Sequence, residues 1–187
     1  MHPPLVSTVG PAGMARRAVL AVGAGLALMA VRGGARAQSA PAATPPAVSL
    51  PPAEARLVLG PAVRLRGRAR LRMLGLSIYE ARLWVGDGFE AMRFDRQPLA
   101  LELQYARSLK GASIAERSIE EMRRGGAIDE ADERRWLAFM KQAFPDVGAG
   151  DRITGTWQPE GSRAAFHVNS GAPQVLTDPA FGPRFFG

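Results

Sequence analysis

Arginine occupies every second position between residues 64 and 72. Residues two apart share one face of a β-strand, whereas a helix would scatter them around its axis. One interpretation is an anion-binding site, because guanidinium groups bind carboxylates and phosphates through paired hydrogen bonds. The alternative is the solvated face of a strand, with its charges compensated by acids on a neighbouring strand. The arginines are Arg64, Arg66, Arg68, Arg70 and Arg72.

Aromatic residues that carry one polar atom follow this row on predicted strands. Tyr79, Trp84 and Tyr105 can each line an apolar pocket and offer it a hydrogen bond, or can pack in a core. Arg107 shares a predicted strand face with Tyr105, so the two could contact a ligand or each other. The candidate ligand-binding residues are Arg70, Arg72, Tyr79, Tyr105 and Arg107.

The sequence lacks the usual signatures of metal, cofactor and nucleophilic chemistry. It contains no cysteine, which excludes disulfides, thiolate nucleophiles and zinc–thiolate sites. The two histidines, His2 and His167, are too few for a histidine-rich metal site, and His167 is typical of a structural residue on a strand. Asp146 and Asp151 flank residues typical of turns. We therefore predict no metal and no cofactor, and assign no catalytic residue.

Most of the chemistry-bearing residues fall on segments with the pattern of strands. Residues 98–106 alternate apolar and polar side chains with the period of a half-buried strand. Near the end of the chain, two short apolar segments flank a hairpin signal at 158–162. The predicted strands are residues 57–59, 63–73, 76–85, 98–106, 153–157 and 163–168.

Two helices are predicted between the early and late strands. Ser113 to Glu116 fit a capping box at the start of the first, and Gly125 stops it. Asp129 can cap the second helix, which ends at Pro145. This order of strands, helices and strands predicts an α+β fold with a mainly antiparallel sheet packed against helices. The apolar helix faces comprise Ala115, Ile119 and Met122, then Trp136, Leu137, Met140 and Phe144.

The positive charge is concentrated at the N-terminus. The 187 residues include 24 Lys and Arg against 17 Asp and Glu, a net charge of +7. An arginine pair, a mostly apolar stretch at 18–31 and a small-x-small sequence at 35–37 predict an export signal over residues 1–37. Removing it leaves 20 basic against 17 acidic residues, a net charge of +3. We predict a periplasmic or secreted protein that does not bind nucleic acid.

A linker and one domain are predicted after the signal. Residues 38–55 are rich in proline, alanine and serine and have little to bury. The domain covers residues 56–187, an ordinary length for one hydrophobic core. Membrane contact is predicted only through the signal segment, for which an uncleaved anchor is the alternative reading. Its apolar stretch is shorter than the roughly 20 residues of a membrane-spanning helix.

Six segments of this domain form a pattern in their order and spacing. They are RLRMLGLSIYEARLW at 70–84, LELQYAR at 101–107, IAERSIEEM at 114–122, FPDV at 144–147, GDR at 150–152 and DPAF at 178–181. This pattern resembles the exported bacterial branch of the chalcone isomerase-like family. The resemblance implies an open-faced β-sandwich, in which an antiparallel sheet packs against helices with a ligand cleft between them.

The resemblance has two functional implications. Enzymes of the family use an arginine, and a sheet threonine that precedes a Val-Tyr pair. Here Ile78-Tyr79 matches the pair, but Leu74 stands at the threonine position and no convincing motif surrounds the arginine position near 62–64. These departures argue against chalcone isomerase activity. Other relatives bind fatty acids with an arginine and a tyrosine at the carboxylate, which would correspond to Tyr79 and an arginine of residues 64–72.

Three functions follow as hypotheses. The first is a non-catalytic protein that binds a small amphipathic acid, such as a fatty acid, in an apolar cleft. The second is an intramolecular isomerase or lyase that stabilises an oxyanion through arginine and tyrosine. The third is a partner-binding domain, which a cleft filled by its own side chains would favour. Relatives also continue beyond the residues that match 184–187, so the resemblance indicates a C-terminal truncation.

Overall fold

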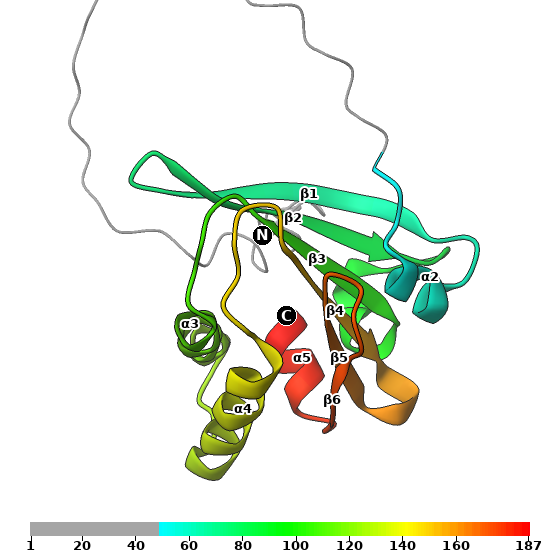
Figure 1. Ribbon diagram of the computed structural model, residues 1–187. Helices are drawn as coiled ribbons and strands as arrows, with labels where there is room; N and C mark the ends of the chain where they lie inside the picture. The colour runs from blue at the N-terminus through cyan, green and yellow to red at the C-terminus, as the bar shows by residue number, and fades with distance from the viewer. Residues whose placement is uncertain (1–48) are drawn as a thin grey trace, which may run out of the picture.

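Six strands form one antiparallel sheet in the computed structural model, which describes residues 49–187 (Figure 1). Each strand pairs with the next one along the chain, so the sheet order is the chain order. The predicted α+β class is confirmed. The predicted export signal and most of the predicted linker lie outside the described residues. The strands are β1 (Arg64–Met73), β2 (Leu76–Val85), β3 (Leu99–Tyr105), β4 (Arg152–Gln158), β5 (Arg163–Val168) and β6 (Gln174–Thr177).

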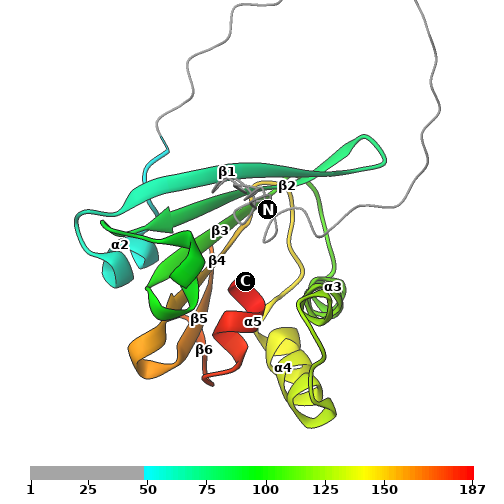
Figure 2. The same cartoon turned by 180° about the vertical axis from the view of Figure 1, so that it is seen from behind.

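Helices pack against both faces of this sheet, but unequally (Figures 1 and 2). Three of them, α3, α4 and α5, share the main hydrophobic core with residues of β2 to β5. On the other face, α2 contributes Ala55 to a small cluster with Trp84 and Ala100. The helices are α2 (Ala53–Leu59), α3 (Gly111–Arg124), α4 (Glu130–Ala143) and α5 (Phe181–Phe186), with short 3-10 helices η1 (Ala91–Arg96) and η2 (Pro159–Gly161).

The main core is built around Phe166 of β5. Its ring is buried and lies with its centroid 4.9 to 6.3 Å from those of five other phenylalanines. Aromatic pairs at such distances add stability beyond their buried area. The core therefore joins β5 to α4 and α5. The five neighbours are Phe139, Phe144, Phe181, Phe185 and Phe186.

The ends of α3 and α4 test the predicted caps. Asp129 caps α4, since its carboxylate accepts a hydrogen bond from the backbone N–H of Ala131 at 2.8 Å. Gly125 ends α3, as predicted. The capping box at Ser113 is wrong, because α3 begins two residues earlier at Gly111. The N–H of Gly111 donates instead to the carboxylate of Asp146, at 3.0 Å and 35 residues away. A distant residue thus replaces the local cap.

The predicted strand at 57–59 is also wrong, because these residues end α2. A run of three apolar residues does not distinguish a strand from a helix. Glu54 and Ala55 are buried, whereas Leu57 is 84% exposed, so one side of the helix faces the sheet. The helix includes the last three residues of the predicted linker.

A β-bulge divides the arginine row. The pairing of β1 with β2 skips Arg66, so Leu65 lies opposite Trp84 and Gly67 lies opposite Leu83. An extra residue shifts the alternation of side chains by one position. Strict alternation predicted that the five arginines share one face of the sheet. The bulge shows that this prediction is wrong. By this register, Arg64 falls on the face opposite to Arg68 and Arg70.

Close packing of α5 against β4 gives a first testable prediction. A Cβ added at Gly182 would lie 2.3 Å from two carbons of the buried Trp157 indole. Gly182→Ala is therefore expected to lower the free energy of unfolding by about 1 to 3 kcal/mol through overpacking. Urea unfolding measures this change. Gly161→Ala is the control, because its added Cβ would meet only a side-chain carbon at 3.8 Å. Equal stability of the two variants would contradict the described packing.

Candidate functional site

Tyr79 and Tyr105 are the two predicted site residues that the structure brings together. They lie opposite each other on β2 and β3, on the face covered by α3. Their rings meet edge to face, with centroids 6.0 Å apart. Tyr105 is buried and Tyr79 is half-buried. The pair therefore leads from the surface into the core between sheet and helices.

A small cavity continues inwards from Tyr105. Its volume is about 30 Å³, and its walls come from β3, β4, β5, α3 and α5. Its size leaves space for little more than a water molecule. The cleft expected between sheet and helices is thus filled mostly by the protein's own side chains, Phe166 and Phe185 among them. The lining residues are Leu101, Leu103, Tyr105, Ile114, Ser118, Phe144, Ile153, Gly155, Phe166 and Phe185.

Two charged residues of α3, Arg117 and Glu121, lie close enough to the Tyr79 hydroxyl to affect its pKa. Burial raises the pKa of the Tyr79 hydroxyl, the negative charge of Glu121 raises it further, and the positive charge of Arg117 opposes this. Burial raises the pKa of Tyr105 strongly, with a further contribution from Tyr79. Both hydroxyls therefore stay protonated at neutral pH and remain able to donate a hydrogen bond.

Arg117 is the cation at this entrance. Its guanidinium contacts Glu120 at 2.7 Å and Glu121 at 2.8 Å on the same helix. Its side chain is less than half exposed, and Glu121 is more buried. Together with Tyr79, these residues make a polar entrance beside an apolar interior. An anionic group could bind there by replacing a glutamate on Arg117.

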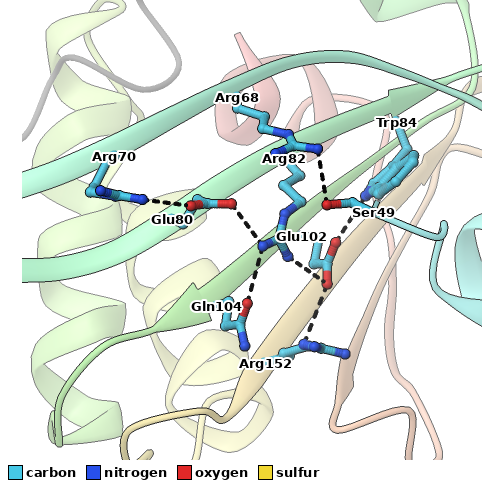
Figure 3. Close-up of polar contacts among 9 residues, drawn as sticks. All are labelled: Ser49, Arg68, Arg70, Glu80, Arg82, Trp84, Glu102, Gln104 and Arg152. Atoms are coloured by element: carbon cyan, nitrogen blue, oxygen red, sulfur yellow. Dashed lines mark hydrogen bonds and ion pairs between the residues drawn. The ribbon is translucent and has the colours of Figure 1, made fainter. Parts of the chain in front are cut away.

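Arg70 does not take part in this entrance. It lies on the opposite face of the sheet, where its guanidinium pairs with Glu80 at 3.1 Å (Figure 3). Adjacent residues of a strand point to opposite faces, which separates Glu80 and its partner from Tyr79. For Arg70, the structure thus supports the alternative of a charge compensated by a neighbouring strand.

A charged network extends from this pair across the sheet (Figure 3). Arg82 contacts Glu80 at 2.7 Å, Gln104 at 3.1 Å and Glu102 at 3.4 Å. The buried carboxylate of Glu102 also accepts from the indole N–H of Trp84 at 3.0 Å. The carboxylates and Gln104 pair with Arg82 and Trp84, and in this network only the Nε of Arg82 is buried without a partner among the described residues. The network therefore has the character of a structural element rather than of an open anion site.

Arg72 and Arg107 belong neither to the entrance at Tyr79 nor to the charged network around Arg82. Both are exposed, Arg72 near the end of β1 and Arg107 in the segment that follows β3. The expected pairing of Arg107 with Tyr105 is not present, since one side chain is exposed and the other is buried. The five predicted site residues therefore occupy three places in the structure, with only the tyrosines in contact.

Two site residues on α3 were missed by the sequence prediction, Arg117 and Ser118. Ser118 lines the cavity, and its hydroxyl donates to the carbonyl of Ile114 within the helix, at 2.9 Å. A signal was present, because Ser118 follows Ile114 by four residues and borders the predicted apolar stripe. The position of Arg117 beside Tyr79 depends on how α3 packs, which no local pattern encodes.

Within residues 49–187, no group of three histidine, aspartate or glutamate side chains is arranged to hold a metal ion. No helix in this range is long and apolar enough to cross a bilayer.

Comparison with known proteins finds similar chains among solved structures. No known protein family matches the chain, and no curated protein sequence does. Among solved structures, a fatty-acid binding protein of Arabidopsis thaliana is similar, with 14% sequence identity and a TM-score of 0.48. The match covers 65% of this chain and 76% of that protein. At this distance the likeness transfers neither ligand nor mechanism to this chain.

Proposed function

We propose that the chain is an exported protein of the chalcone isomerase-like family that binds a small amphipathic acid, such as a fatty acid, without catalysis. The observation that carries this proposal is the polar entrance at Tyr79 and Arg117 beside the apolar cavity at Tyr105. Binding sites of this kind combine apolar walls with a few placed polar groups. An acyl chain would occupy the interior, with its carboxylate at the entrance.

The interior must widen before it can hold an acyl chain, because the cavity is only about 30 Å³. Phe185 of α5 is the side chain best placed to move. It lines the cavity and is only partly buried, and it belongs to a helix of six residues. The walls are otherwise mostly apolar, and an apolar cavity stays dry and accepts apolar ligands. A ligand would therefore displace Phe185 rather than ordered water.

The head group of the ligand belongs at the entrance. The Tyr79 hydroxyl stays protonated and can donate one hydrogen bond, while Arg117 offers its charge and two further donors. Glu120 and Glu121 occupy the guanidinium in the absence of ligand. A carboxylate would exchange with one of them, which keeps the charge on Arg117 compensated throughout.

A partner-binding domain without a small-molecule site is the second candidate. One observation favours it: the protein's own aromatic side chains nearly fill the cleft. The two candidate functions predict different acyl-chain binding when the cavity is enlarged. Phe185→Ala creates room beside Phe166. A ligand-binding protein then binds an acyl chain at least as well as before, whereas a partner-binding domain gains no saturable binding.

Blocking the cavity tests the proposed function. Ser118→Leu places a larger side chain in the cavity and breaks only a hydrogen bond within α3. It is expected to weaken binding of a fluorescent fatty acid at least about tenfold, because the acyl chain loses its space. Ser113→Leu makes the same change at an exposed position of the same helix and should bind like the wild type. Equal affinity of both variants, or no saturable binding by the wild type, would overturn the proposal.

The head-group contact gives a separate prediction. Arg117→Gln removes the cation and is expected to weaken fatty-acid binding about ten- to a hundredfold, the range for a hydrogen bond to a charged group. Binding of the uncharged methyl ester should change little. Arg134→Gln is the control, since Arg134 pairs only with Glu130 on the exposed face of α4 among the described residues. Isothermal titration calorimetry with both ligands measures the difference, and an equal loss for acid and ester would contradict the assignment.

A further inference from the structure

Three large apolar side chains are exposed at the end of the β1–β2 hairpin. Met73 is 49% exposed, Leu74 is 88% exposed and Leu76 is 53% exposed. Residues 73–76 are called the hairpin tip here. Both views show this end of the hairpin projecting beyond the rest of the domain (Figures 1 and 2). The tip therefore presents apolar surface that no described part of the chain covers.

The backbone at the tip makes the presence of a leucine informative. Leu74 has φ +50° and Gly75 has φ +79°, so both central residues of the turn are left-handed. Such two-residue turns favour Asn-Gly, because asparagine tolerates this conformation and leucine does not. Leu74 thus strains the turn without burying its side chain in the fold. Folding alone does not explain a leucine here, whereas contact with an external apolar phase does.

Two exposed arginines lie at the base of the tip. Arg72 directly precedes it, and Arg107 follows Ala106, whose N–H donates to the carbonyl of Ile78 at 2.8 Å. Neither arginine has a hydrogen bond or ion pair with another residue in the described range 49–187. The segments 71–79 and 103–115 contain no acid. Two arginines without an ion pair among the described residues therefore accompany the apolar tip.

We propose that the hairpin tip, with Arg72 and Arg107, docks onto a membrane surface that contains anionic lipids. The apolar side chains would enter the interface, and the two guanidinium groups would contact lipid phosphates. A protein partner fits less well, because a stable protein interface buries about 800 Å² on each side, far more than three side chains offer. This contact lies outside the signal segment, which is the only membrane contact that the sequence predicts.

A fluorescent label at the tip tests the proposal in the full chain. Because the chain contains no cysteine, Leu74→Cys accepts a single environment-sensitive nitrobenzoxadiazole group. The label should shift to the blue and brighten with phosphatidylcholine vesicles that contain phosphatidylglycerol, and salt should reverse the change. The same label at Leu57→Cys, an exposed leucine of α2, should not respond. This local readout is unaffected by anchoring through the N-terminal segment.

Variants then separate lipid docking from other causes of the signal. Arg72→Gln and Arg107→Gln should each raise the lipid concentration at half-saturation about fivefold, whereas Arg66→Gln, an exposed arginine at the bulge, should not. Leu74→Asn, followed through a label at Leu76→Cys, should raise the melting temperature and weaken docking, which excludes unfolding as the cause. A silent label at Leu74→Cys, an equal response at Leu57→Cys, or a response to protein concentration without vesicles would overturn the proposal.

Discussion

Asp178→Ala is expected to lower the free energy of unfolding by about 3 to 4 kcal/mol. The buried carboxylate of Asp178 accepts from the indole N–H of Trp136 at 2.8 Å, and from the backbone of Ala180 at 2.9 Å and Phe181 at 3.3 Å. Arg135 also contacts it. The substitution leaves a buried indole without an acceptor and uncaps α5. Denaturant unfolding measures the loss, and a change below about 1 kcal/mol would contradict this role.

Two controls isolate the cause of that loss. Asp132→Ala removes the exposed contact of Arg135 and one of three acids in the first turn of α4, and should cost less than about 1 kcal/mol. The pH dependence of the free energy of unfolding is the second control. Burial acts to raise the pKa of Asp178, but hydrogen bonds from Trp136 and the backbone outweigh it and hold the pKa below its ordinary value of 3.8. A carboxylate whose pKa is lower in the folded than in the unfolded state stabilises the fold at pH values above 3.8. The difference in stability between wild type and Asp178→Asn should therefore shrink as the pH falls below 3.8.

Glu102→Ala is expected to lower the free energy of unfolding by about 3 kcal/mol or more. Its carboxylate is buried and is contacted by Trp84, Arg82 and Arg152. Removing it leaves the buried Trp84 indole N–H without an acceptor and takes one of two acids from Arg82, whose side chain is only 13% exposed. Removing one partner of a buried ion pair costs more stability than the intact pair contributes, because the remaining charge stays buried without its partner.

Matched variants show whether charge or hydrogen bonding dominates at Glu102. Glu102→Gln keeps an oxygen for the Trp84 indole, so a smaller loss than in Glu102→Ala identifies the indole contact. Arg152→Gln removes a partner that is about half exposed and should cost less than about 1 kcal/mol. Thermal and urea unfolding measure all three variants. An equal cost for Arg152→Gln and Glu102→Ala would contradict the buried network.

Local pattern predicted much of the fold. The period of two over residues 98–106 and the cap at Asp129 each depend on neighbours in sequence, and both are confirmed as β3 and the start of α4. The start of α3 could not be predicted in this way, because Asp146 caps it from 35 residues away. The run at 57–59 was too short to separate helix from strand, and packing on the sheet decided it.

The candidate site was predictable only in part. Tyr79 and Tyr105 meet because both lie on the inward face of neighbouring strands, which the alternation of residues indicates. The shared face predicted for the arginine row was wrong, because the bulge at Arg66 depends on pairing with β2. The Arg70–Glu80 pair supports the alternative that the sequence also offered, a strand face whose charge is compensated by a neighbouring strand. Arg117 reaches the entrance through the packing of a helix, and only tertiary structure shows it.

The two proposals place related functions at one end of the domain. Tyr79 lies three residues beyond Leu76, so the entrance to the proposed binding site is close in sequence to the hairpin tip. A protein docked through the tip would hold this entrance near the membrane, where amphipathic acids partition. Each proposal is tested by its own variants, because the cavity residue Ser118 and the tip residue Leu74 belong to different elements.

The central claim, that an acyl chain enters the space between the sheet and α3, is tested most directly by nuclear Overhauser effects. The protein is labelled with carbon-13 and saturated with an unlabelled fatty acid. We expect cross-peaks from the acyl methylenes to the methyl groups of Ile114 and Ile153, which line the cavity. Cross-peaks confined to exposed side chains such as Leu57, or none at saturation, would contradict it.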